Sequence, residues 1–219
     1  MTSARLTDNL DAIAEQIRLS FTAKDAAREK LLPLCREVIR YSSTAIRTLH
    51  RQEFDPAKEM LGSAAGLLNE AKLATNQNSD LSNTGFFRDA QKEFAEAAIT
   101  LALVTGKQVP TPDELDTEFA AYLNGMGEAV GELRRFILDG IRREDLSRGE
   151  ELLEAMDDIY NVLVTMDFPD AITAGLRRTT DMVRGVLERT RSDLTMIMRQ
   201  NKLEAKLRIF GENLKEHKH

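Results

Sequence analysis

The chain has 219 residues, of which 42% are apolar and 30% charged, and its formal net charge is −6. This length suits one all-α domain with a sizeable core, or at most two small domains. The negative charge argues against a protein that grips duplex DNA with its whole outer surface, because such proteins are usually basic. The single cysteine, Cys35, excludes an internal disulfide and fits a reducing compartment.

The composition predicts a cytoplasmic, helical protein without a membrane partner. The opening segment MTSARLTDNLDAIAEQ has no apolar signal core. No uncharged run approaches the ~20 residues needed to span a bilayer. Ala, Leu, Glu and Arg dominate the sequence, and all four favour helix.

Apolar residues at helical spacing predict two amphipathic helices at the start of the chain, over Leu6–Phe21 and Ala23–Gln52. Pro33 lies inside the second, where we expect it to kink the helix or to begin a new first turn. Asp55 and Pro56 then predict another helix start, as an N-cap followed by proline at the first helical position.

A predicted loop over 76–84 leads into a helix over Gly85–Thr105. On that helix Asp89, Glu93 and Glu96 share a strip roughly 60° wide beside an apolar face. Three carboxylates on one strip repel each other unless a positive charge lies among them. The strip therefore predicts either a bound metal ion or neighbouring arginine and lysine side chains.

Helical signals continue through the second half of the chain. The segment Thr111–Glu114 combines an N-cap, a proline and a capping-box glutamate, which predicts a short helix. Two further helices are expected over 120–143 and 147–166, and the second ends before Pro169.

From Asp170 to about Lys215 the pattern stays helical. About 45 helical residues would span nearly 70 Å, so this helix either breaks near Gly211 or packs its end on another subunit, and we favour an oligomer. No segment alternates like a strand, and no linker or repeat divides the chain. The sequence thus predicts an all-α fold, a single bundle of seven helices in one domain over 1–219.

Glu93 and Glu96 are the strongest candidates for metal ligands, because i,i+3 spacing places both side chains on one side of a helix. Mg²⁺ prefers one or two carboxylates together with waters and phosphate oxygens. Such pairs also occur on solvated helix faces. Asp158 and Asn161 belong to a second polar cluster that could add a ligand, although residues of this kind more often lie at the surface.

Other chemistries find little support. The sequence lacks the glycine-rich phosphate-binding motifs. A single cysteine and three histidines argue against zinc. Gly125, Gly127 and Gly131 fit close helix packing. Paired arginines such as Arg134 and Arg135 suit phosphate binding, but salt bridges to the many glutamates would account for most of them.

Four segments together resemble the translin superfamily, which comprises translin and translin-associated factor X. The segments are IRTLHRQEF (46–54), QKEFAEA (91–97), AYLNGMGEAVGELRR (121–135) and GLRRTTDMVRGVLERTRSDLT (175–195). The resemblance runs from about Leu10 to Thr195. It implies an all-α protein that assembles into a hollow homo-oligomer, usually an octamer, with single-stranded RNA or DNA inside. An enclosed binding surface would reconcile an acidic protein with a nucleic-acid partner.

The resemblance to the factor X branch implies an Mg²⁺-dependent endoribonuclease centre, in which Mn²⁺ is an alternative ion. In that branch a Glu-x-x-Glu pair followed by Ala acts with an Asp from a later helix. Glu93 and Glu96 match the pair. The resemblance places Asn161 at the Asp position, and Asp158, about one turn away, offers a compensating carboxylate.

Three hypotheses follow. In the first, Glu93 and Glu96 bind Mg²⁺ for cleavage of single-stranded RNA, while Arg88, Arg134 and Arg135 hold the nucleic-acid backbone. In the second, the protein is a non-catalytic shell that binds single strands. In the third, it is a helical scaffold for another protein, with no nucleic acid.

Overall fold

The computed structural model describes residues 7–75 and 84–216, without the side chains of 214–216. Within these residues the chain forms seven helices and no strand, which confirms the predicted all-α bundle. The helices are α1 (Leu10–His50), α2 (Phe54–Thr75), α4 (Gly85–Val104), α5 (Phe119–Arg142), α6 (Gly149–Val164), α7 (Asp170–Thr173) and α8 (Leu176–Glu216). Apart from Thr84, the predicted loop over 76–84 lies outside the described residues.

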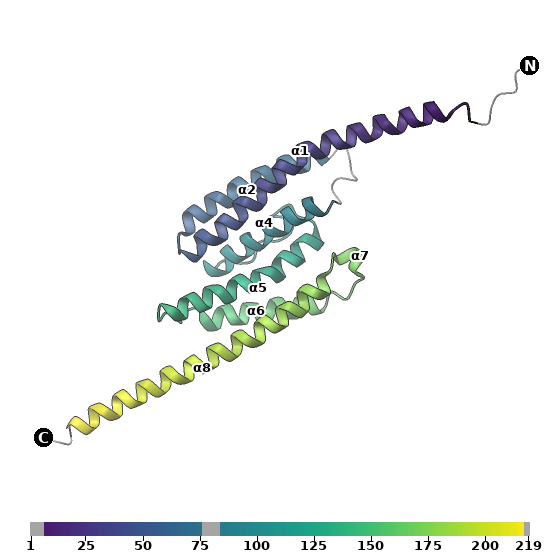
Figure 1. Cartoon of the computed structure of the whole chain (residues 1–219). Helices are drawn as coiled ribbons and strands as arrows, with labels where there is room; N and C mark the ends of the chain where they lie inside the picture. Colours follow the sequence, from purple (N-terminus) through teal and green to yellow (C-terminus); the bar gives the residue numbers. More distant parts are fainter. Residues whose placement is uncertain (1–6, 76–83, 217–219) are drawn as a thin grey trace, which may run out of the picture.

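The helices stack in layers that follow chain order (Figure 1). The paired helices α1 and α2 pack on α4, α4 packs on α5, and α5 packs on α6 and α8. Each helix buries the apolar stripe predicted by its 3.6-residue period. The largest fully buried side chains include Leu31, Leu49, Ile99, Leu133, Leu152, Met156, Leu163, Leu176 and Leu194. Helix α4 thus lies in the middle of the stack, with neighbours on both sides.

The first two predicted helices are one continuous helix, α1, of 41 residues. Of the two alternatives for Pro33, a new first turn is therefore wrong. Proline removes one backbone donor, which leaves the carbonyl one turn earlier without its helical partner. Pro33 and Glu29, whose carbonyl loses its partner, are both exposed, so that carbonyl is open to solvent.

The outer ends of α1 and α8 project beyond the bundle in opposite directions (Figure 1). The first buried residue of α1 is Leu31, and the last buried residue of α8 is Leu194. Helix α8 runs through Gly211 without a break, so the first of the two alternatives, a break near Gly211, is wrong. The chain breaks earlier, between α7 and α8, where Ala174 and Gly175 have φ values of 52° and 84°.

The capping box at Thr111 forms, but the helix it predicted does not. The Glu114 carboxylate accepts a hydrogen bond from the backbone N–H of Thr111 at 2.7 Å, and Thr111 Oγ1 accepts one from Glu114 N–H at 3.2 Å. One turn later Asp116 takes a left-handed φ of 49°. The N–H of Thr117 then bonds to the carbonyl of Pro112, as at a helix C-terminus. The segment is therefore a single turn.

Two polar contacts fix the ends of the central helix. At the N-terminal end of α4, the Gln91 side chain accepts a hydrogen bond of 2.6 Å from the N–H of Glu118, just before α5. At its C-terminal end, the Arg148 guanidinium donates to the last carbonyls of α4, those of Leu103 and Val104, at 3.0 and 2.9 Å. Helix α4 is therefore held in register with α5 and α6.

Gly125 allows α4 and α5 to approach closely. A Cβ added at Gly125 would lie 2.5 Å from the Lys92 carbonyl oxygen, and one added at Gly127 would lie 2.4 Å from the methyl group of Thr179. The packing role predicted for both glycines is confirmed. Gly131 has nothing within 4 Å of the corresponding position, so the role is wrong for Gly131.

Candidate metal centre

Three carboxylates meet where α4 and α5 are closest. Glu93 and Glu96 come from α4 and Glu128 comes from α5, and one ligand oxygen from each lies within 4.8 Å of the other two. Glu96 is buried, while Glu93 and Glu128 are half-buried. The i,i+3 spacing turns both α4 side chains toward α5. Asp89, the third acid of the predicted strip, is exposed and is not a member of this group.

The donor set suits a hard divalent cation. Carboxylate oxygens are the ligands that Mg²⁺ and Mn²⁺ take in proteins. Ligand oxygens around one Mg²⁺ lie about 3–4 Å apart, given Mg–O distances of roughly 2.1 Å. The separations between Glu93, Glu96 and Glu128 need only small side-chain rotations to reach that geometry. These three residues could therefore hold one ion, with open positions for water or phosphate oxygens.

The electrostatics of the site favour a bound cation. Burial, and after it the nearby carboxylates of Glu93 and Glu128, raise the pKa of Glu96 to about 8. Burial also raises the pKa of Glu93, against the lowering effect of Lys92. Without an added cation the group therefore retains a proton near neutral pH.

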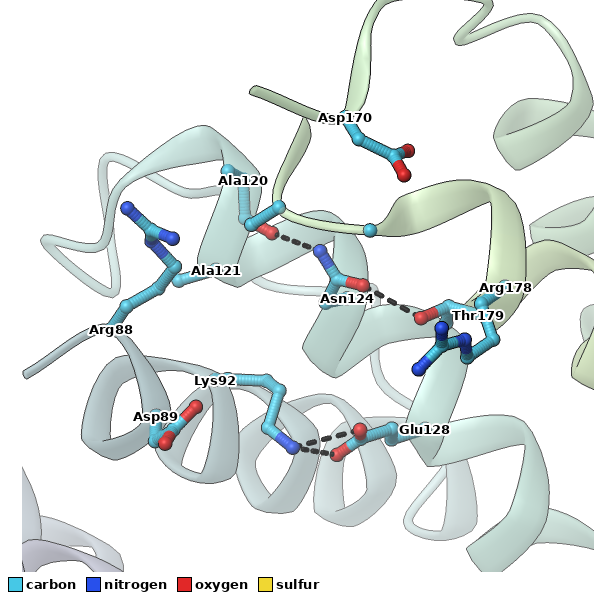
Figure 2. Close-up of a pocket in the computed structure, with 12 residues that line it drawn as sticks. Arg88, Asp89, Lys92, Ala120, Ala121, Asn124, Glu128, Asp170, Arg178 and Thr179 are labelled. Carbon is cyan, nitrogen blue, oxygen red and sulfur yellow. Dashed lines mark hydrogen bonds and ion pairs between the residues drawn. The ribbon is translucent and has the colours of Figure 1, made fainter. Parts of the chain in front are cut away.

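Lys92 already supplies one positive charge (Figure 2). Its Nζ lies 2.8 and 2.7 Å from the two carboxylate oxygens of Glu128 and 3.6 Å from Glu93. Burial would lower the pKa of Lys92, but the ion pair with Glu128 and the fields of Glu93 and Asp89 raise it overall. Within the described residues, this ammonium is the one ion-pair partner of the three ligand carboxylates.

A buried histidine contacts α5 at Glu132, one helical turn beyond Glu128 of the metal centre. His50, buried at the end of α1, places Nε2 2.5 Å from a Glu132 oxygen and Nδ1 3.7 Å from Asp139. Glu132 also contributes to the raised pKa of Glu96. His50 thus connects α1 to the acidic face of α5, a role that its isolation in the sequence did not reveal.

The third carboxylate of the group comes from α5, whereas the additional ligands predicted from the sequence lie on α6. Asp158 is not a member of the carboxylate group, and both Asp158 and Asn161 are exposed on α6. The opposite side of α6, with Met156 and Ile159, is the side buried in the bundle. The sequence did contain a signal for Glu128, since it follows Gly125 by three residues and so lies on the side of α5 that meets α4.

The three predicted nucleic-acid contacts have different surroundings. Arg134 is half-buried, pairs with Asp193 of α8 at 2.8 Å and donates to Thr190 at 3.1 Å. That arrangement ties α5 to α8 and occupies the guanidinium. Arg135 is exposed, 3.8 Å from Glu132. Arg88 lines a cavity that also contains Glu128.

The fold and the site together define an all-helical protein with a carboxylate centre between α4 and α5. Proteins of similar sequence and structure are known. No protein-family model matches the chain. The uncharacterized protein MJ0175 of Methanocaldococcus jannaschii is 30% identical over 188 residues, which cover 84% of this chain and 82% of that protein.

Solved structures give the family. The chain is 32% identical to AfC3PO, from Archaeoglobus, in its complex with duplex RNA, with a TM-score of 0.74 over 86% of this chain and 98% of that one. The crystal structure of AfC3PO alone gives 32% identity and a TM-score of 0.73, over 82% and 94%. The apo-NeC3PO structure, at 16% identity and a TM-score of 0.71 over 87% and 97%, shares the fold. The chain belongs to the translin superfamily.

None of the helices within 7–75 and 84–216 is both long and apolar enough to cross a bilayer.

Proposed function

We propose that this protein binds single-stranded nucleic acid and cleaves single-stranded RNA at a divalent metal centre formed by Glu93, Glu96 and Glu128. The similarity to AfC3PO, whose structure contains duplex RNA, supports nucleic acid as the partner. The observation that carries the nuclease proposal is the convergence of the three carboxylates from α4 and α5. A buried group of like charges is costly to keep unless it binds a cation.

In this proposal the chain's own residues hold and order the reacting groups. Glu93, Glu96 and Glu128 bind the ion, and Glu96 gives up its proton when the ion binds. A bound Mg²⁺ supplies Lewis acidity toward a phosphodiester and lowers the pKa of an attacking water. Half-buried Lys92, freed from Glu128 in part by the ion, remains within reach to donate hydrogen bonds to a phosphate oxygen.

The test uses a labelled single-stranded RNA with Mg²⁺ or EDTA, the unaltered protein and a Glu93→Gln/Glu96→Gln variant. We expect cleavage with Mg²⁺, none in EDTA, and a loss of at least about 100-fold in the variant while RNA still binds. Mg²⁺-dependent cleavage that survives in the variant would contradict the site. The Asp158→Asn variant is the matched control, because it removes an exposed acid outside the group.

The alternative function is a non-catalytic shell that binds single strands. The ion pair between Lys92 and Glu128 favours it, because an internal ammonium already neutralises part of the acidic group. Binding of RNA in a gel-shift assay without cleavage in Mg²⁺ or Mn²⁺ would select this alternative. Absence of binding even at low salt, where phosphate contacts are strongest, would select the scaffold function.

We also propose that the chain assembles with copies of itself through the projecting ends of α1 and α8. Both ends expose large apolar side chains at more than half of their full area, including Leu10 and Phe21 on α1 and Leu207 and Phe210 on α8. Their charges are complementary. Asp8, just before α1, and Asp11 and Glu15 in its first turns outnumber Arg18, whereas the end of α8 carries Arg199, Lys202, Lys206 and Arg208 against Glu204 and Glu212. Light scattering tests this, and a mass of 24.6 kDa, the monomer, would contradict it.

A further inference from the structure

A cavity of about 320 Å³ opens beside the candidate metal centre, between α4, α5 and the start of α8 (Figure 2). Glu128 and Lys92 line it, so the cavity and the metal centre share a wall. Arg88 enters it from α4 and Arg178 from α8. Anything bound in the cavity therefore lies next to the ion site.

Arg88 lacks a partner for a buried donor. It is half-buried, and its Nε is shielded from solvent without a hydrogen-bond partner in the described part of the chain. A buried N–H without an acceptor is destabilising. Arg88 is also the fourth residue of α4, near the positive end of the helix dipole, where a cation is unfavourable and an anion is stabilised. An anion in the cavity would relieve the second of these costs, because Arg88 lines the cavity at the N-terminal end of α4.

Arg178 brings a second guanidinium and a second helix N-terminus. It is exposed, and its side chain makes no hydrogen bond or ion pair with any residue in 7–75 or 84–216 for which side chains are described. Ala174 and Gly175, which directly precede α8, line the same cavity. The first N–H groups of a helix have no intrahelical acceptors and attract anions.

The acids of the cavity do not cancel these two arginines. Glu128 is paired with Lys92 at 2.7 Å. Asp89 and Asp170 are exposed and therefore hydrated. Asn124 is fully committed to protein, because its amide donates to the carbonyls of Ala120 and Thr173 and accepts a hydrogen bond from Thr179. The cavity thus carries two guanidinium groups, those of Arg88 and Arg178, without an ion-pair partner among the described side chains, and a guanidinium fork suits phosphate.

We propose that Arg88 and Arg178 form a phosphate subsite that holds an internal phosphodiester of a single strand, adjacent to the phosphodiester at the metal centre. This inference rests on the proposed function. It adds Arg178 to the predicted nucleic-acid contacts. It also places the strand along the side of the cavity that carries Glu128.

The experiment measures binding of a fluorescent single-stranded RNA by anisotropy, in EDTA and over a range of salt concentrations. The full chain is compared with Arg88→Gln, Arg178→Gln and the double variant. Arg177→Gln is the matched control, because Arg177 is the adjacent arginine of α8 and lines a different cavity, between α6 and α8. We expect each single variant to lose about tenfold in affinity and the salt slope to fall by about 0.7 per arginine.

A second series locates the phosphate by replacing one linkage at a time with an uncharged methylphosphonate. One substituted linkage should weaken binding to the full chain and have no further effect on the double variant. Equal losses for 5′-phosphorylated and 5′-hydroxyl strands are expected for an internal phosphate.

Three results would overturn the subsite: an unchanged salt slope in the double variant, the same loss in Arg177→Gln, or a loss confined to 5′-phosphorylated strands. Failure of the proposed function is distinguishable, because the full chain itself would then not bind RNA at low salt.

Discussion

The ammonium group of Lys92 bridges both carboxylate oxygens of Glu128, at 2.7 and 2.8 Å, across the interface between α4 and α5. The same ammonium lies 3.6 Å from Glu93. The acidic strip of α4 was expected to need a positive charge, either from a metal ion or from basic side chains. The structure supplies a lysine and keeps the carboxylates close enough together to share an ion as well.

Replacing Lys92 with methionine should separate the stabilisation that the lysine gives from the stabilisation that a bound ion gives. The variant loses a half-buried ion pair, so we expect its free energy of unfolding in EDTA to fall by about 1–3 kcal/mol. Its stabilisation by Mn²⁺ should exceed that of the unaltered protein, because Glu128 no longer has an internal partner and ligand binding adds stability by mass action. Thermal unfolding with EDTA and with Mn²⁺ measures both. The prediction fails if Lys92→Met gains no more from Mn²⁺ than Lys92→Arg does.

The buried carboxyl of Glu96 predicts a pH-dependent stability. Its pKa is about 8 in the folded protein and 4.5 at its ordinary value. Between these values the folded state holds a proton that the unfolded state has lost, so the free energy of unfolding in EDTA should fall as pH rises from 5 to 8, by a few kcal/mol as an order of magnitude. Glu96→Gln should flatten this part of the profile. Urea unfolding at pH 5, 6.5 and 8 measures it, and parallel profiles for the two proteins would refute the assignment.

Binding of Mn²⁺ should depend on Glu128 and not on α6. Glu128→Gln keeps the size of the side chain and removes its charge, so we expect at least a tenfold loss of Mn²⁺ affinity by calorimetry. Asp158→Asn and Asn161→Ala should bind as the unaltered protein does, since both residues are exposed outside the group. The reverse pattern would return the third ligand to α6.

The close approach at Gly125 should matter for both stability and metal binding. An added methyl group would press against the Lys92 carbonyl and the Ala95 side chain, so Gly125→Ala should destabilise the protein by about 1–3 kcal/mol. It should also weaken Mn²⁺ binding, because it separates Glu128 from the α4 carboxylates. Gly131→Ala meets no atom within 4 Å and should stabilise by about 0.5–1 kcal/mol. Similar unfolding midpoints for the two variants would count against this role of Gly125.

Much of the fold could be predicted because helical period and capping are local properties. The apolar stripes of α2, α4 and α5 and the capping box at Thr111 all follow from residues a few positions apart. What failed depended on solvent exposure or on backbone conformation: the continuity of α1 through exposed Pro33, and the single turn ended by the left-handed Asp116. Neither feature leaves a periodic signal.

The site was predicted in part for the same reason. The spacing of Glu93 and Glu96 places them on one face, and the structure brings them together. Glu128 lies on another helix, and its approach depends on how closely Gly125 lets α4 and α5 pack. The prediction of Asn161 came from matching a sequence position, and Asn161 lies exposed on α6, whereas Glu128 lies on the helix that packs against α4.

The projecting ends of α1 and α8 have one further consequence. No residue of α1 before Leu31 and no described side chain of α8 after Leu194 is buried, and most of the stability of a helix in a protein comes from packing of its apolar face. The far-ultraviolet circular dichroism of the protein should then weaken on dilution while its central bundle remains folded. Helicity itself would thus report whether neighbouring copies are bound.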